Sequence, residues 1–143
     1  MVQRVVSADV KVAGSVVASI DRGLLLLAGF NRDDGPQCLD PMARRVARLR
    51  IFPDQAGRMQ FDVVDSGGQV LVVPQFTLYG NTRRGRRPDF TAALEPEAAR
   101  VLFDGFVDAL RGAGIAAPAC GVFGADMQVG LVNDGPVTLI LDS

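Results

Sequence analysis

Apolar and polar positions divide the chain into short strands and two helices. Residues 2–10 (VQRVVSADV) and 16–20 are rich in valine and partly alternate with polar residues, which predicts a hairpin with its turn at residues 13–15. Residues 24–30 (LLLLAGF) are apolar without alternation, as expected of a strand that is buried on both faces. Residues 70–77 predict a central strand in which Pro74 marks an end or a bulge.

Two further segments have apolar side chains at the three- and four-residue spacing of amphipathic helices. The first covers residues 37–49 and the second residues 95–110, with Pro41 and Pro96 at or near their first turns. Weaker patterns predict strands at residues 59–64, 121–123 and 127–132. We therefore expect one α/β domain over residues 1–143, with two main helices and seven or more strands.

A cluster of turn-forming residues interrupts the C-terminal strand region. Residues 129–132 and 137–141 are apolar, and Asn133-Asp134-Gly135-Pro136 lies between them. Asn, Asp and Gly favour turns, and Pro cannot donate a hydrogen bond within a sheet. The pattern fits an ordinary hairpin turn, and it also fits a rigid break that holds the backbone of Gly135 and Pro136 at a fixed angle.

The composition excludes several kinds of site. The chain has no histidine, which excludes Ser-His-Asp catalysis, Cys-His catalysis and histidine-ligated metals. Cys38 and Cys120 fit no metal or redox spacing, so we expect plain thiols. No glycine-rich nucleotide motif indicates a cofactor. The longest apolar run is strand-sized and the N-terminus lacks a signal-peptide core, which predicts a cytoplasmic protein without a membrane partner.

The charge is unevenly distributed. The formal net charge is -1, yet residues 81–88 (NTRRGRRP) hold four of the 15 basic residues and no acidic residue. We name residues 79–90 the arginine loop. A basic loop on an otherwise acidic body fits a contact with phosphate or nucleic acid, and it also fits a solvated surface loop.

Candidate chemistry lies in two motifs that follow buried strands, residues 74–78 (PQFTL) and 133–138 (NDGPVT). In the first, Gln75 offers an amide, Thr77 a hydroxyl, and Phe76 a backbone N–H that could stabilise an oxyanion. No base stands near Thr77 in the sequence, so the residues alone favour a structural threonine over a nucleophile. Arg4, inside the first predicted strand, fits either a solvated side chain or a contact with a carbonyl at a strand end.

The chain resembles the D-aminoacyl-tRNA deacylases over nearly its whole length. The resemblance is carried by VLVVPQFTLYGNTRRGRRPDF (residues 70–90) and GVFGADMQVGLVNDGPVTLILD (residues 121–142). The segments QRV, GLLLLAGF and RIFPDQAGRMQ fit the family as well. The resemblance implies a layered α/β/β fold with a mixed, partly barrel-like sheet, and a homodimer with active sites at the subunit interface.

The implied reaction is hydrolysis of the ester between a D-amino acid and the terminal adenosine of tRNA, with glycyl esters also accepted. By the same resemblance, Gly135-Pro136 is the Gly-cis-Pro pair that enters the partner's pocket and blocks L side chains. Arg4 would brace that pair. Gln75, Phe76 and Thr77 would lie at the scissile ester beside Pro74, with the 2′-hydroxyl of the RNA and water carrying the protons.

The remaining implied contacts are with the RNA at the 3′ end. Phe123 and Met127 would hold the terminal adenine by stacking and apolar contact. Phosphate contacts would come from the arginine loop, through Arg83, Arg84, Arg86 and Arg87. The resemblance implies no metal and no cofactor.

One position departs from the family pattern, because Pro74 stands where the family usually has serine in Ser-Gln-Phe-Thr-Leu. A related deacylase that accepts L-alanyl esters also has Pro-Gln there. Pro74 therefore leaves open a deacylase of relaxed specificity. The arginine loop leaves open a second alternative, a non-catalytic nucleic-acid-binding module on the same fold.

Overall fold

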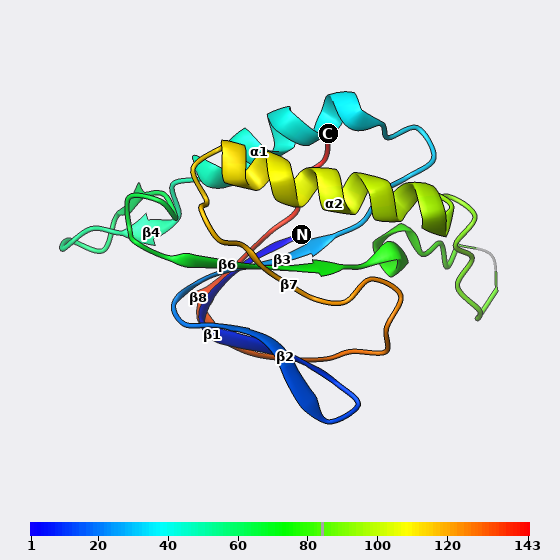
Figure 1. Ribbon diagram of the computed structural model, residues 1–143. Coiled ribbons are helices and arrows are strands. Elements are labelled where there is room, and N and C mark those ends of the chain that lie inside the picture. The colour runs from blue at the N-terminus through cyan, green and yellow to red at the C-terminus, as the bar shows by residue number, and fades with distance from the viewer. Residues whose placement is uncertain (84) are drawn as a thin grey trace.

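The computed structural model describes residues 1–83 and 85–143. The chain begins with three long strands, continues through a short hairpin and a central strand, and ends with a long strand after the second helix (Figure 1). The strands are β1 (Val2–Val12), β2 (Ser15–Ile20), β3 (Gly23–Ala28), β4 (Phe52–Pro53), β5 (Met59–Phe61), β6 (Gln69–Pro74), β7 (Ala119–Cys120) and β8 (Gln128–Leu139). The helices are η1 (Pro36–Cys38), α1 (Leu39–Ala47), η2 (Phe76–Tyr79) and α2 (Pro96–Gly112).

The main sheet is mixed and folds back under itself. Its order is β2-β1-β3-β6-β7, with β8 on the other edge of β1; β3, β6 and β7 are parallel. The first residues of β1 pair with β3, while its later residues pair with β2, so β1 passes from the upper layer into the lower one. Figure 1 shows α1 and α2 above the sheet and β2 beneath it. The expected α/β/β layering with a partly closed sheet is therefore confirmed.

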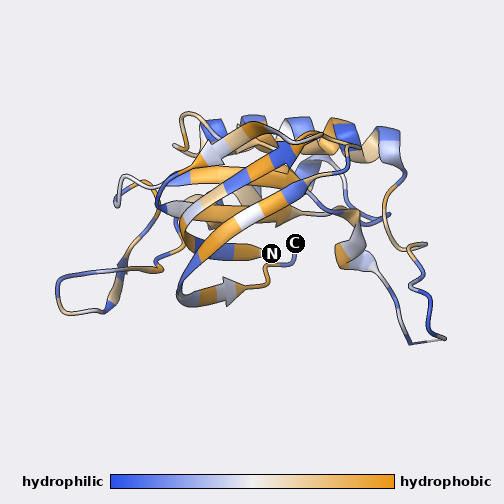
Figure 2. Cartoon of the chain, turned by 90° about the horizontal axis from the view of Figure 1, so that it is seen from below, coloured by the Kyte–Doolittle hydropathy of each residue, from blue (hydrophilic) through white to orange (hydrophobic). Residues whose placement is uncertain are grey.

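Alternating side chains of the central strands build two cores. Leu24 and Leu26 point toward the helices, where α1 and α2 supply residues such as Val46 and Phe106. Leu25, between them, belongs to the second core, beneath the sheet with Val5 and residues of β6. Burial on both sides explains why the β3 run is apolar without alternation. In Figure 2, seen from below, apolar and polar residues also alternate along the lower strands.

The structure corrects several predicted boundaries. The central strand ends at Pro74, and residues 76–79 form the 3₁₀ helix η2, so the predicted strand at 70–77 is wrong over its last residues. The strand piece predicted at 121–123 is also wrong, because β7 ends at Cys120 and a loop follows. The first helix begins as the 3₁₀ turn η1 and continues as α1, which ends at Ala47.

The C-terminal break is a bulge within one strand and not a hairpin turn. One step along β1, from Arg4 to Val5, corresponds to four steps along β8, from Val137 to Asn133. The three residues from Asp134 to Pro136 therefore have no partner on β1, and β8 continues along the same neighbour on both sides. The interpretation as a break is right, and the hairpin alternative is wrong.

Candidate functional site

The carboxyl ends of the parallel strands carry the first group of predicted site residues. Pro74 is the last residue of β6. The backbone N–H of Gln75 donates to the Ala28 carbonyl at 2.7 Å, and this bond holds the chain against the end of β3. Gly29 allows this approach, because a Cβ there would lie 2.6 Å from the Gln75 carbonyl oxygen. In open sheets, ligands bind in the crevice at this end of the strands.

Gln75, Phe76 and Thr77 form a small polar constellation at the start of η2. The Gln75 Nε2 amide donates to Thr77 Oγ1, which fixes the two side chains relative to each other. Phe76 is the first residue of η2, so its N–H has no acceptor within the helix. The Phe76 ring is 56% exposed and meets the Phe90 ring edge to face, with 5.2 Å between the centroids. A half-buried amide, an exposed hydroxyl and an N–H without an acceptor in η2 thus lie close together.

The loop after β7 brings Phe123 and Met127 to the same end of the sheet. Gly121 places this loop beside β6: its N–H donates to the Val72 carbonyl at 2.8 Å, and a Cβ on it would lie 2.9 Å from Met127 Sδ and 3.4 Å from Pro74 Cδ. Phe123 is half-buried against α2, with its ring centroid 6.1 Å from that of Phe103. The structure therefore brings Pro74–Thr77 close to the loop after β7, although the two segments are far apart in the sequence.

Arg4 and Gly135-Pro136 form a second group elsewhere on the sheet. Arg4 is buried, and its Nε lies 3.0 Å from Asp134 Oδ2 and 3.2 Å from the Asp134 carbonyl oxygen. Its Nη1 donates to the Ile51 carbonyl. A Cβ on Gly135 would lie 3.1 Å from Arg4 Nη2, so the guanidinium packs directly against the bulge. Gly135 and Pro136 are exposed, and the peptide bond between them is cis, as the resemblance implies.

The two groups do not meet within one chain. Arg4 is opposite Leu24 of β3, whereas Pro74 is opposite Ala28 at the far end of the same strand. Four residues along β3 and two strand spacings across the sheet separate them by on the order of 15 Å, and β8 lies one strand further away. In Figure 1, η2 and the bulge of β8 accordingly lie at different ends of the sheet.

The arginine loop follows η2 directly and is closed at its base. Asn81 and Asp89 exchange backbone hydrogen bonds of 2.7 and 2.9 Å. Hydrogen bonds from Thr91 are the main cause of an Asp89 pKa below its usual range, and the positive charge of Arg32 adds to this. Arg83, Arg86 and Arg87 are exposed, and Arg84 lies outside the described residues.

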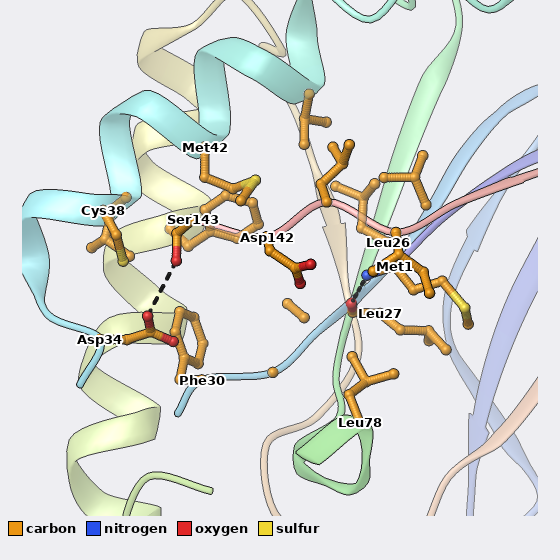
Figure 3. Close-up of a pocket in the computed structure, with 18 of the residues that line it drawn as sticks. Met1, Leu26, Leu27, Phe30, Asp34, Cys38, Met42, Leu78, Asp142 and Ser143 are labelled. Carbon is orange, nitrogen blue, oxygen red and sulfur yellow. Dashed lines mark hydrogen bonds between the residues drawn. The ribbon is translucent and has the colours of Figure 1, made fainter. Parts of the chain in front are cut away.

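A cavity of about 210 Å³ lies next to η2, and no pattern in the sequence predicted it (Figure 3). Apolar side chains of β3, α1, η2 and the C-terminal tail line most of it, Met42 and Leu78 among them. The Met1 amino group donates to the Leu27 carbonyl at 2.8 Å, and burial lowers its pKa. Because both chain ends contribute, only the folded chain creates this space.

Other candidate chemistry is absent from the part of the chain that the structure describes. No group of His, Cys, Asp and Glu there could hold a metal ion. Cys38 and Cys120 are free and half-buried, and burial is the main cause that raises the pKa of the Cys120 thiol. None of the described helices combines the length and apolar character that crossing a membrane requires.

Comparison with known proteins gives matches over the full chain. The sequence profile of the family described as D-Tyr-tRNA(Tyr) deacylase matches residues 1–142. Proteins named D-aminoacyl-tRNA deacylase from Chloroflexus aurantiacus and Chlorobaculum tepidum are each 52% identical over 143 residues, covering 100% of this chain and 89% and 95% of theirs.

Two solved structures share the fold. A c-Myc DNA unwinding element binding protein superimposes with a TM-score of 0.93 at 38% identity, covering 99% of this chain and 96% of that one. A probable eukaryotic D-amino acid tRNA deacylase superimposes with a TM-score of 0.81 at 18% identity, covering 94% and 93%.

Proposed function

The chain belongs to the D-Tyr-tRNA(Tyr) deacylase family and is a hydrolase of D-aminoacyl-tRNA; we propose that it rejects L-aminoacyl esters through a pocket shared between two subunits. The products are the free D-amino acid and tRNA. The observation that carries the proposal is the Gln75–Phe76–Thr77 constellation, which follows the buried strand β6. Phe76 and Thr77 are exposed, Gln75 is half-buried, and the Phe76 N–H has no acceptor within η2. Within one chain, nothing from Gly135-Pro136 reaches it.

The chemistry is ester hydrolysis assisted by position. Water attacks the ester carbonyl, and the developing oxyanion accepts a hydrogen bond from the Phe76 N–H. The bond between the carbonyl carbon and the ribose oxygen of the terminal adenosine then breaks. The neighbouring 2′-hydroxyl of the RNA relays the protons, which is consistent with a chain that has no histidine. Gln75 and Thr77, linked to each other, orient the ester. Phe123 and Met127 hold the adenine at the same end of the sheet.

The positions of the two groups support a homodimer. Gly135 and Pro136 are exposed on β8, which pairs with β1 alone among the described strands and so leaves its other edge open. Apolar side chains near this edge are exposed, including Val6 and Val132 at 52% and 55%. A second copy that covers this edge places each Gly135-Pro136 in the partner's pocket. The backbone of Gly135-Pro136, which Arg4 braces, leaves no room in that pocket for an L side chain.

The first test compares hydrolysis of D-tyrosyl-, L-tyrosyl-, glycyl- and L-alanyl-tRNA at one low enzyme concentration. We expect rapid loss of the D and glycyl esters and survival of the L esters. Cleavage of L-alanyl-tRNA would indicate that Pro74 marks a relaxed pocket. Failure to cleave any ester would refute the hydrolase.

The second test replaces Gly135-Pro136 by Ala-Ala. We expect the D/L selectivity to fall while the dimer and its far-UV spectrum persist. Lys11→Ala, at an exposed position of the neighbouring strand β1 outside both motifs, is the control and should keep full selectivity. Unchanged selectivity in the Ala-Ala variant would remove Gly135-Pro136 from the chiral filter.

A binding function without catalysis is the second candidate, and it rests on the structure named a c-Myc DNA unwinding element binding protein, which is 38% identical. In this case the arginine loop would be the working surface. Nucleic-acid affinity together with no turnover of any aminoacyl ester would favour it over the hydrolase.

A further inference from the structure

A second basic surface lies at the C-terminal end of α1 and in the residues that follow it, away from the arginine loop. We name Arg44, Arg45, Arg48 and Arg50 the α1 arginine face. All four side chains are exposed, and together with Leu49 they line one open hollow of the surface. Asp40 is the one acidic residue in the sequence from the start of α1 to Arg50.

The α1 arginine face has little function in stabilising the fold. The ion pairs of the described residues involve Arg4, Arg58 and Arg111, and none involves this face. Arg45 Nη1 donates to the Asp142 carbonyl at 2.9 Å, which ties the C-terminal tail to the helix. Arg44 in the last turn of α1 and Arg48 at its C-cap are four residues apart, and like charges at this spacing repel. Such a concentration of positive charge fits an anionic partner.

The position of the face links it to the Gly135-Pro136 end of the domain. Arg50 directly precedes Ile51, whose carbonyl accepts a hydrogen bond from Arg4, and Arg4 in turn holds Asp134. In Figure 1, the C-terminal end of α1 lies near β4, whereas η2 and the start of the arginine loop lie at the opposite end of the molecule. The two basic regions of one chain are therefore far apart.

We propose that the α1 arginine face contacts backbone phosphates of the tRNA whose 3′ end occupies the partner's pocket. This inference rests on the proposed function, because the Gly135-Pro136 of one subunit enters the pocket of the other. Because Arg50 adjoins Ile51, which contacts Arg4 at the bulge, the α1 arginine face of the first subunit would then lie toward the pocket of the second. Guanidinium groups bind phosphate oxygens in pairs and read no base sequence, as a general tRNA editor requires. The tRNA is thus held by both subunits.

The test is the double variant Arg44→Gln/Arg48→Gln, which leaves the Arg45 tether intact. The matched control is Lys11→Gln/Arg100→Gln, which removes the same charge from exposed positions on β1 and α2. Each dimer is assayed from 50 to 200 mM salt on D-tyrosyl-tRNA and on D-tyrosyl-adenosine, which has no backbone phosphates. Each lost phosphate contact lowers the salt dependence by a slope of about 0.7 to 0.9.

Between 50 and 200 mM salt, the KM for D-tyrosyl-tRNA should rise in both proteins. We expect the factor of increase to be about 7- to 12-fold larger for the wild type than for the double variant, because two phosphate contacts are lost. At 50 mM salt the double variant should have the higher KM, with kcat unchanged. Hydrolysis of D-tyrosyl-adenosine should be equal in all three proteins.

If the double variant has the same KM and the same salt dependence of KM as the wild type, the inference is overturned. So would a control variant that is as impaired as the double variant. Failure of the wild type on both substrates would instead refute the hydrolase, so the two failures are distinguishable.

Discussion

Phe76→Pro removes one backbone N–H at the point where the oxyanion is proposed to form. The substitution suits the local backbone, because Phe76 is the first residue of η2, where proline is tolerated. Gln75 before it has φ -147° and ψ 83°, outside the helical region that proline disfavours in its predecessor. The variant therefore tests a single hydrogen-bond donor with little disturbance of the chain.

The expected effect is a loss of about 10²- to 10³-fold in kcat, or about 2.7 to 4 kcal/mol of transition-state stabilisation, as for other oxyanion donors. Proline also removes the aromatic ring, whose edge-to-face contact with Phe90 contributes about 0.5 to 1.5 kcal/mol to stability. Phe76→Ala removes the same ring and keeps the N–H. The difference between the two variants thus isolates the donor.

The assay is single-turnover hydrolysis of D-tyrosyl-tRNA at saturating enzyme, which separates the chemical step from substrate binding. Urea unfolding of both variants checks that they are equally folded. If folded Phe76→Pro hydrolyses the ester as fast as Phe76→Ala, the Phe76 N–H stabilises no oxyanion, and the proposed chemistry at η2 is refuted.

Three further predictions concern other residues. Thr77→Val should lose far less than the about 10²- to 10⁴-fold that a proton-transfer group contributes, because in the proposed mechanism the RNA hydroxyl relays the protons. Loss of all activity in the folded variant would make Thr77 a nucleophile. Arg4→Met leaves the Asp134 carboxylate unpaired. Because the Asp134 side chain is 33% exposed, we expect the free energy of unfolding in urea to fall by about 2 to 3 kcal/mol, which is below the range for fully buried pairs. A fall of less than about 1 kcal/mol would contradict the bracing role. Burial, followed by the charge of Asp34, raises the pKa of Tyr79, the one tyrosine in the chain. Absorbance at about 295 nm should therefore titrate with a midpoint above the ordinary value of about 10. As the pH rises above about 10, the contribution of Tyr79 to stability should fall, because the tyrosine of the unfolded chain ionises first. A midpoint at or below about 10 would show that the ring is solvated.

The sequence determined the elements whose pattern is local. The amphipathic spacing of residues 95–110 gave α2 to within two residues at its C-terminal end, and the unbroken apolar run of β3 indicated a strand covered on both faces. Pro74 predicted a strand end or a bulge, because proline cannot donate within a ladder. It could not show that η2 would follow, since the apolar Phe76 and Leu78 also suit a strand.

Pairing and packing between distant segments bring the site residues together, and local sequence pattern does not encode them. The turn residues before Val137 suit a hairpin and a bulge equally well, and pairing with β1 on both sides selects the bulge. The contact of Met127 with Gly121 beside Pro74 depends on parallel pairing between β6 and β7, which sequence spacing does not encode. Arg4 is a plain charged residue in the sequence. Strand register places it opposite the bulge, where it is buried and where Asp134 and the Ile51 carbonyl satisfy its charge and its donors.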